Sequence, residues 1–363
     1  MPTLQQLASE GAYARRVRSV FPALTYPAHT TLVTGALPAR HGVCHNRPFE
    51  SGGQSGRWLW EASHIRVPTL WEAVRAAGGR TATVSCPVTV GAEIDWNLPD
   101  VRPLDGSDPM APIREATTPP ELFEELEREA TGVLRGENFS IARLAREDRV
   151  GAIAAYLFER YRPALLLVHC IGTDHVQHQL GRDNPMTRRA VGAADRAIGQ
   201  VLESVERLGL RDRTAFVLTG DHGSAGIHSQ LRPNVWLAAA RAREVVESQP
   251  PGIRGLVRVV TREELDVLGA DPAASFALCA TLGIEIHEAS SAPELVPRVG
   301  AAHGYLPDEP AMHTGFVAAG AGIRSGAVAP EFRLEQIAPL VAALLSLDFD
   351  APDGALLPGL LAT

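Results

Sequence analysis

The sequence predicts an α/β fold in which a mostly parallel central sheet carries helices on both faces. Helical and strand-like segments alternate along almost all of the 363 residues, which is typical of this arrangement. Some strand-like runs, such as "ALLLVHC" and "TGFVAAG", are continuously apolar, as strands buried on both faces are. Core strands resume on both sides of residues 241–300. We therefore predict one domain, residues 1–363, with an inserted segment at about 241–300.

Capping residues and hydrophobic periodicity indicate where individual elements begin and end. In "TLWEAVRAAGG", Thr69 and Glu72 have capping-box spacing and Gly78 lies past the helix end, after which "TATVSCP" predicts a strand. A long helix is expected from about Thr187 to Leu208, followed by the buried strand "RTAFVLT". Another helix is expected in "TTPPELFEEL", with Thr118 as its N-cap. The long helix carries one apolar stripe: Val191, Ala194, Ile198, Val201, Val205 and Leu208.

Composition and charge exclude several classes of function. With 45% hydrophobic and 21% charged residues, the chain is typical of a soluble globular protein, and its net charge of −8 argues against a nucleic-acid footprint. The absence of lysine excludes a P-loop lysine and a pyridoxal Schiff base. No apolar run reaches the length of a membrane span. We expect a cytoplasmic protein as the sequence stands, with export left open if an amino-terminal extension exists; the oligomeric state is undetermined.

Residues 21–35, "FPALTYPAHTTLVTG", predict a short helix with a threonine at its start. Pro27 suits the first helical turn, where a missing N–H costs nothing, and Gly35 suits the position past the end. Thr25 would then lie where unpaired N–H groups and the positive end of the helix dipole favour an alkoxide or a phosphate. The alternative is that Thr25 only caps the helix through its side chain.

Three clusters of acidic and histidine residues follow predicted strands. Asp174 and His178 are four residues apart, so both project from one face of a helical turn. Asp221 and His222 follow a strand directly, and His303 stands between small residues before another strand. Each cluster alone is more often structural. Together, and with a threonine at a helix start, they predict one site.

Aspartate and histidine ligands without thiolates favour zinc over manganese or iron. Two divalent ions about 4 Å apart would hold both the attacking and the leaving oxygen of a displacement at phosphorus. A threonine hydroxyl without an adjacent base is a poor nucleophile, and such ions would activate it.

The ordered motifs "SVFPALTYPAHTTLVTGALPARHGV", "GTDHVQHQLG", "LTGDHG" and "HGYLPDEPAMHTGFVAAG" resemble the nucleotide pyrophosphatase/phosphodiesterase branch of the alkaline phosphatase superfamily. The resemblance implies an alkaline-phosphatase-like fold and hydrolysis of a small-molecule phosphoester, with Thr25 transiently phosphorylated. It also implies two metal ions, one held by Asp174, His178 and His303 and the other by Thr25, Asp221 and His222.

The same resemblance suggests substrate contacts and shows departures from the family. Tyr26 resembles an aromatic position against which nucleotide-type substrates stack, the alternative being a core aromatic residue. His169 lies where relatives often carry tyrosine. Ala28 replaces the asparagine that the family is expected to use as a donor to a phosphoryl oxygen. "CHNRP" around Cys44 lacks the C-x-P-x-R pattern of sulfatases, which argues against that activity.

The start of the sequence also departs from the family, which opens with a buried strand ending in an aspartate ligand. Here "MPTLQQLASEGAYARRV" predicts the helix that would follow such a strand, and Glu10 is the only acid before Thr25. We expect the reading frame to extend upstream of Met1 through an apolar strand ending in aspartate, because a missing interior strand leaves backbone groups unpaired. The alternative is a degenerate, non-catalytic member of the family that binds one metal ion or an anion.

Overall fold

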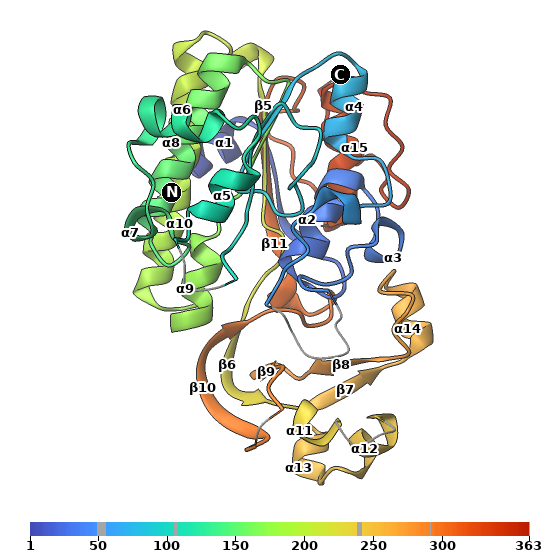
Figure 1. Ribbon diagram of the computed structural model, residues 1–363. Coiled ribbons are helices and arrows are strands. Elements are labelled where there is room, and N and C mark those ends of the chain that lie inside the picture. Colours follow the sequence, from blue (N-terminus) through green and yellow to red (C-terminus); the bar gives the residue numbers. More distant parts are fainter. Residues whose placement is uncertain (49–55, 105–107, 238–241, 291, 363) are drawn as a thin grey trace.

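The computed structural model describes residues 1–363 except 49–55, 105–107, 238–241, 291 and 363. The chain forms an α/β body and a smaller lobe that extends from one end of it (Figure 1). Among the helices in the described part of the chain, none combines the length and the apolar character that a membrane span needs.

One part of the central sheet has four strands in the order β12-β1-β11-β5. β11 is antiparallel to both of its neighbours, whereas β1 and β12 are parallel. β11 is thus the exception in the mostly parallel sheet that the sequence predicts, because this strand returns from the smaller lobe in the opposite direction. These strands span Ala12–Arg18 (β1), Ala215–Thr219 (β5), Thr314–Gly320 (β11) and Phe332–Arg333 (β12).

The other part of the sheet has three strands in the order β3-β2-β4, all parallel. They are short and mostly buried, with all four side chains of β2 covered. Within the described residues no hydrogen-bonded strand joins β4 to β5, so the two parts of the sheet are separate. These strands span Thr81–Val84 (β2), Trp96–Leu98 (β3) and Leu165–Val168 (β4).

Helices cover both faces of the body, as the sequence predicts. Along β11, Val317 packs with Leu7 of α1 and Leu202 of α10, whereas Phe316 packs with Ala28 of α2 and Leu340 of α15. Alternate side chains of one strand point to opposite faces, so these helices form two layers. The layer on the Val317 face, together with the neighbouring helices, comprises α1 (Pro2–Glu10), α5 (Ala111–Ala116), α6 (Leu122–Leu126), α7 (Gly136–Phe139), α8 (Ala145–Tyr161), α9 (Gly172–Leu180) and α10 (Pro185–Arg207). The second layer contains α2 (Thr25–Thr34), α3 (Pro38–His41), α4 (Leu70–Ala76) and α15 (Ile337–Leu344).

Local capping signals correctly predicted several helix ends. Thr69 and Glu72 form both hydrogen bonds of a capping box at the start of α4. Gly35 ends α2 with a φ of 64°, in the left-handed region that glycine adopts without a Cβ penalty. The expectation that Thr118 caps a helix was wrong, because α6 begins at Leu122. Thr118 instead exchanges two backbone hydrogen bonds with Asn97 of β3, so a long-range strand contact replaces the local cap.

The smaller lobe contains most of the segment predicted as an insertion at about 241–300. A three-stranded sheet in the order β10-β6-β9 connects it to the body, and a two-stranded sheet pairs β7 with β8 (Figure 1). The strands are β6 (Ala225–Leu231), β7 (Val257–Val260), β8 (Ala277–Ala280), β9 (Ile284–Ile286) and β10 (Leu295–Ala302). The helices are α11 (Asn234–Leu237), α12 (Ala242–Ser248), α13 (Pro251–Arg254) and α14 (Arg262–Val267).

Candidate active site

Thr25 is the first residue of α2, and the N-cap of this helix is Leu24, so Thr25 does not occupy the capping position. Its hydroxyl oxygen instead lies 3.4 Å from Nε2 of His222. The cis peptide bond between Phe21 and Pro22 lies in the loop that leads to this helix start. Capping therefore does not account for Thr25, whose hydroxyl faces a histidine from a different part of the chain.

Asp174, His178 and His303 converge on one point. The i, i+4 spacing on α9 brings Oδ1 of Asp174 to 3.4 Å from Nε2 of His178. Nε2 of His303, which follows β10, lies 3.0 Å from Nε2 of His178 and 3.7 Å from Oδ1 of Asp174. Ligands of a tetrahedral zinc ion are about 3.3 Å apart, given zinc–ligand distances near 2.0–2.1 Å. The donor types and their spacing therefore fit one divalent metal ion.

A glycine allows β10 to approach α9 closely enough for this arrangement. The register of β10 against β6 shifts between Pro297 and Gly300, and a Cβ at Gly300 would collide with the carbonyl oxygen of His178. Only glycine avoids this contact without moving the backbone. Because His303 directly follows β10, this close approach brings its side chain next to His178 of α9.

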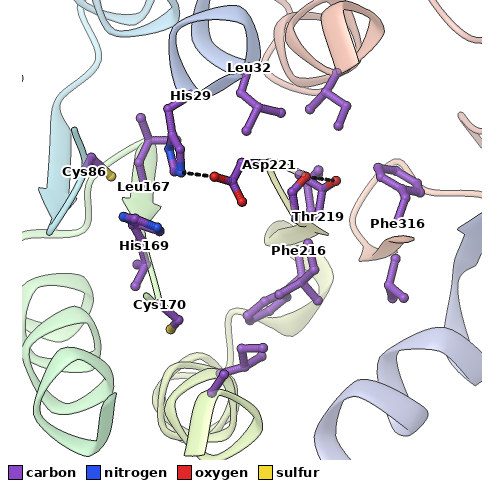
Figure 2. A pocket seen from close by; sticks show the side chains of 18 of the residues that line it. His29, Leu32, Cys86, Leu167, His169, Cys170, Phe216, Thr219, Asp221 and Phe316 are labelled. Atoms are coloured by element: carbon purple, nitrogen blue, oxygen red, sulfur yellow. Dashed lines mark hydrogen bonds and ion pairs between the residues drawn. The ribbon is translucent and has the colours of Figure 1, made fainter. Parts of the chain in front are cut away.

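Asp221 and His222 form a second group beside Thr25. Oδ2 of Asp221 lies 3.2 Å from Nε2 of His222. The same oxygen lies 3.9 Å from Nε2 of His29 (Figure 2). The His222 and His303 rings stack with centroids 3.8 Å apart, so the two groups adjoin. Asp174, His222 and His303 have ligand atoms within 4.8 Å of one another, which places His222 between the two groups.

Backbone carbonyls orient the two stacked imidazoles. Nδ1 of His303 lies 2.8 Å from the carbonyl oxygen of Ala23, and Nδ1 of His222 lies 3.0 Å from that of Gly223. A carbonyl only accepts, so each Nδ1 carries the proton and donates it. Nε2 of each ring therefore keeps a free lone pair directed into the site, as a metal ligand requires.

Burial and neighbouring charges keep these groups in the forms that bind metal. Burial, reinforced by His222, lowers the pKa of His303 to about 3. Burial raises the pKa of the Asp221 carboxyl, but His222 and His29 lower it more, to about 2. At neutral pH the site thus presents an uncharged His303 imidazole and an ionised Asp221 carboxylate, so cation binding need not displace protons from these two groups.

The two predicted substrate contacts lie in different surroundings. Tyr26 is 0% exposed and packs against Trp58 with ring centroids 5.2 Å apart, which matches the core alternative considered for it. His169 is 9% exposed and borders the cavity beside the site, with its ring centroid 4.3 Å from that of His29. Nδ1 of His169 lies 3.1 Å from the carbonyl oxygen of Ser85, which fixes the ring.

Three further residues support the site and were not predicted. His29 lies beside Asp221, and its position four residues after Thr25 on the same helix was a usable signal. Oδ1 of Asn46 accepts the backbone N–H of Tyr26 at 2.9 Å, which places its amide beside the helix start. Oε1 of the fully buried Glu147 accepts the backbone N–H of Gly172, the first residue of α9, at 2.8 Å.

The fold, with acidic and histidine side chains gathered at strand ends beside a threonine, is that of the alkaline-phosphatase-like proteins. The chain belongs to the type I phosphodiesterase/nucleotide pyrophosphatase family, whose model matches residues 1–281. Human ectonucleotide pyrophosphatase/phosphodiesterase 5 superposes over 100% of this chain and 94% of its own, with a TM-score of 0.73 and 19% identity.

Relatives identified by sequence have longer chains than this protein. An uncharacterised pyrophosphatase/phosphodiesterase of Schizosaccharomyces pombe is 25% identical over 62% of this chain and 41% of its own length. Human ectonucleotide pyrophosphatase/phosphodiesterase family member 7 is 23% identical over 61% of this chain and 43% of its own length. The matches to these curated relatives thus cover less than half of their length.

Proposed function

We propose that this chain is a two-metal phosphoester hydrolase of the phosphodiesterase/nucleotide pyrophosphatase type, with Thr25 as the nucleophile. The observation that carries the proposal is the Thr25 hydroxyl, which lies one residue past the N-cap of α2 and 3.4 Å from Nε2 of His222. Family membership supports the same chemistry. A murine relative, an inactive variant of ectonucleotide pyrophosphatase/phosphodiesterase 5, has been solved in complex with AMP, which supports a nucleotide-type substrate.

Asp174, His178 and His303 would hold one divalent ion, and Asp221 and His222 with Thr25 would hold a second, with zinc favoured by the donor set. When bound, such ions would neutralise phosphoryl charge and lower the pKa of the Thr25 hydroxyl. Asp221 and Asp174 supply the negative charge that such cations require.

The residues of the chain supply the covalent chemistry and the orientation. The Thr25 oxygen loses its proton and forms a bond to phosphorus, while the leaving oxygen departs with the electrons of the ester bond and takes up a proton. Water then cleaves the phosphothreonine and restores the hydroxyl. The α2 start would contribute its helix dipole to the phosphoryl group. The Asn46 amide, whose oxygen accepts the Tyr26 N–H, would donate to a phosphoryl oxygen where Ala28 cannot.

We propose that diesters and pyrophosphates are preferred to monoesters, because the segment 21–35 has no arginine beside Thr25 to bind a dianion. The test uses zinc-loaded protein with bis-p-nitrophenyl phosphate, p-nitrophenyl thymidine 5′-monophosphate and p-nitrophenyl phosphate. A higher kcat/KM for the monoester than for both diesters would contradict the preference. Metal-loaded protein that cleaves none of the three would favour the non-catalytic alternative.

A further inference from the structure

Trp58 contacts both Tyr26 and the guanidinium group of Arg102. The ring centroids of Tyr26 and Trp58 are 5.2 Å apart, and Cζ of Arg102 lies 4.2 Å from the centroid of the Trp58 ring. A cation at this distance is attracted by the negative face of the indole. Tyr26 directly follows Thr25, so two side-chain contacts connect Arg102 to the predicted nucleophile.

Arg102 lies at the edge of the candidate site. Its side chain is 27% exposed, so a molecule in solution can reach it. Burial lowers the pKa of His175, and the positive charge of Arg102 lowers it further, so Arg102 acts on α9 as well as on the start of α2. His175 directly follows Asp174, one of the predicted metal ligands. Arg102 is therefore near both segments that carry the predicted chemistry.

Among the described residues, the charge of Arg102 is only weakly paired. Nη2 of Arg102 lies 3.7 Å from Oδ2 of Asp100, which exceeds hydrogen-bond distance. Nε of Arg102 is buried and has no hydrogen-bond partner within the part of the chain that the structure describes. Arg47 lies 5.4 Å from the same Trp58 ring but differs, because its Nη1 is 3.0 Å from Oε1 of Glu288. The guanidinium of Arg102 thus keeps donors for a further acceptor.

The packing around Trp58 prevents a nucleobase from stacking on Tyr26. Tyr26 is 0% exposed and belongs to an apolar cluster with Trp60 and Val101, against which Trp58 packs. A planar base would have to displace this packed cluster. Arg102 offers an accessible positive charge beside it, and guanidinium groups bind phosphate and carboxylate oxygens in pairs. This part of the site therefore favours an anionic group over an aromatic ring.

We propose that Arg102 is a specificity-determining residue that binds a second anionic group, a phosphate or a carboxylate, on the phosphoester substrate. The proposal rests on the phosphoester hydrolysis proposed above. Tyr26 and Trp58 separate Arg102 from Thr25, so its partner is a group next to the reacting phosphoryl and not the phosphoryl itself. Such a contact is made in the ground state and the transition state alike, so it should act on KM more than on kcat. A nucleotide would be recognised through its phosphates and not through its base.

The first test uses zinc-loaded protein and three diesters that release the same p-nitrophenolate. Their second substituents are ethyl, which is uncharged, 2-carboxyethyl and 2-phosphonooxyethyl. KM should be at least about 10-fold lower for one charged diester than for the ethyl diester, as expected for a charge-assisted hydrogen bond. The lower of the two charged KM values identifies the anion as a carboxylate or a phosphate. Equal KM values for all three diesters would overturn the proposal.

Substitutions at Arg102 separate its charge from its packing on Trp58. Arg102→Met keeps an apolar chain over the indole, so it should raise KM for the charged diester about 10-fold and leave kcat and the ethyl diester within about twofold. Arg102→Lys keeps a charge without the planar fork and should recover part of the binding. Arg298→Met is the control, because Arg298 pairs with Glu285 at 2.9 Å in the smaller lobe. An equal rise of KM in Arg298→Met, or for the ethyl diester in Arg102→Met, would overturn the proposal.

Binding to metal-free protein distinguishes this inference from the proposed function. Inorganic pyrophosphate and malonate serve as probes and tryptophan fluorescence as the readout, because an anion bound to Arg102 changes the environment of Trp58. The fluorescence of the wild type should change on titration, and the change should be lost in Arg102→Met and in Trp58→Phe. A wild type that responds but hydrolyses no diester would contradict the proposed function and keep Arg102 as an anion-binding residue. No response in the wild type, or a response that persists in Arg102→Met, would overturn the inference.

Discussion

Nε2 of His303 lies 3.0 Å from Nε2 of His178, although 125 residues separate the two histidines in sequence. The Nδ1–H of His303 is bonded to the carbonyl of Ala23, in the loop before Thr25. One imidazole therefore connects the predicted nucleophile loop, the end of β10 and helix α9. Changes at any of these three places should alter the same site.

Thr25→Ala should abolish turnover, by at least about 10³-fold in kcat, while leaving the fold and most metal binding intact. Leu24, and not Thr25, is the N-cap of α2, so the helix keeps its N-cap when the hydroxyl is removed. The measurements are steady-state kinetics, circular dichroism and bound metal. Thr25→Ser, which keeps a hydroxyl, should retain part of the activity. An unchanged kcat in the alanine variant would remove Thr25 from the mechanism.

Asn46→Ala should lower kcat by about 10²–10³-fold, the usual effect of losing one oxyanion donor. Asn46→Asp separates donation from positioning, because its carboxylate still accepts the Tyr26 N–H but offers no N–H to a phosphoryl oxygen. Both variants should therefore be equally impaired in kcat, with the Tm of Asn46→Asp near that of the wild type. Wild-type kcat in Asn46→Asp would show that the residue only positions the helix start.

His303→Ala should lose more metal than His222→Ala. Asp174, His178 and His303 supply three protein ligands with an open fourth position, which is a normal catalytic zinc arrangement. Loss of one of these ligands should weaken metal binding by more than about 100-fold. Loss of a residue that only hydrogen-bonds to a ligand already weakens metal binding by up to about 100-fold. Elemental analysis after dialysis against a weak chelator decides the ranking. Greater loss in His222→Ala would assign His222 to the tighter site.

Glu147→Ala should lower both the metal affinity and the stability of the protein. Glu147 accepts the Gly172 N–H at the start of α9. This helix carries Asp174 and His178, so its position sets the position of both predicted ligands. Loss of this buried hydrogen bond should cost about 1.5–3 kcal/mol. Glu147→Gln keeps an acceptor oxygen and should recover part of the affinity. Glu335→Ala is the control: Glu335 is also buried, in the short helix Leu334–Gln336, and its loss should lower Tm without changing zinc affinity. Equal zinc affinities in all of these variants would exclude the positioning role.

The free energy of unfolding should decrease as the pH falls below 6.5, partly because of His41. Burial lowers the pKa of His41 from 6.5 to about 3, so between these values the unfolded chain binds a proton that the folded chain does not. The contribution of neutral His41 is thus complete above pH 6.5 and is lost toward pH 3, at about 1.4 kcal/mol per pH unit. His41→Gln should reduce the slope of unfolding free energy against pH by about one proton. An unchanged slope would contradict this assignment.

The sequence by itself determined those features that depend on neighbouring residues. The capping box of Thr69 and Glu72, the left-handed Gly35 and the shared helical face of Asp174 and His178 all follow from spacings of four residues or fewer. Backbone hydrogen bonding and helical periodicity act over that range, so a short window of sequence contains the whole interaction.

Only the tertiary structure decided which distant groups meet. The burial of Tyr26 against Trp58, the bond from Tyr26 to Asn46 and that from Gly172 to Glu147 join segments with no periodic relation. Thr118 shows the same effect, since its pairing with Asn97 overrides a good local capping signal. These contacts depend on how layers of helices and strands pack, and packing free energy is shared among residues far apart in the chain. The cavity lined by β4 and β5 is the clearest case, because the α10 stripe predicted a buried face but not what covers it.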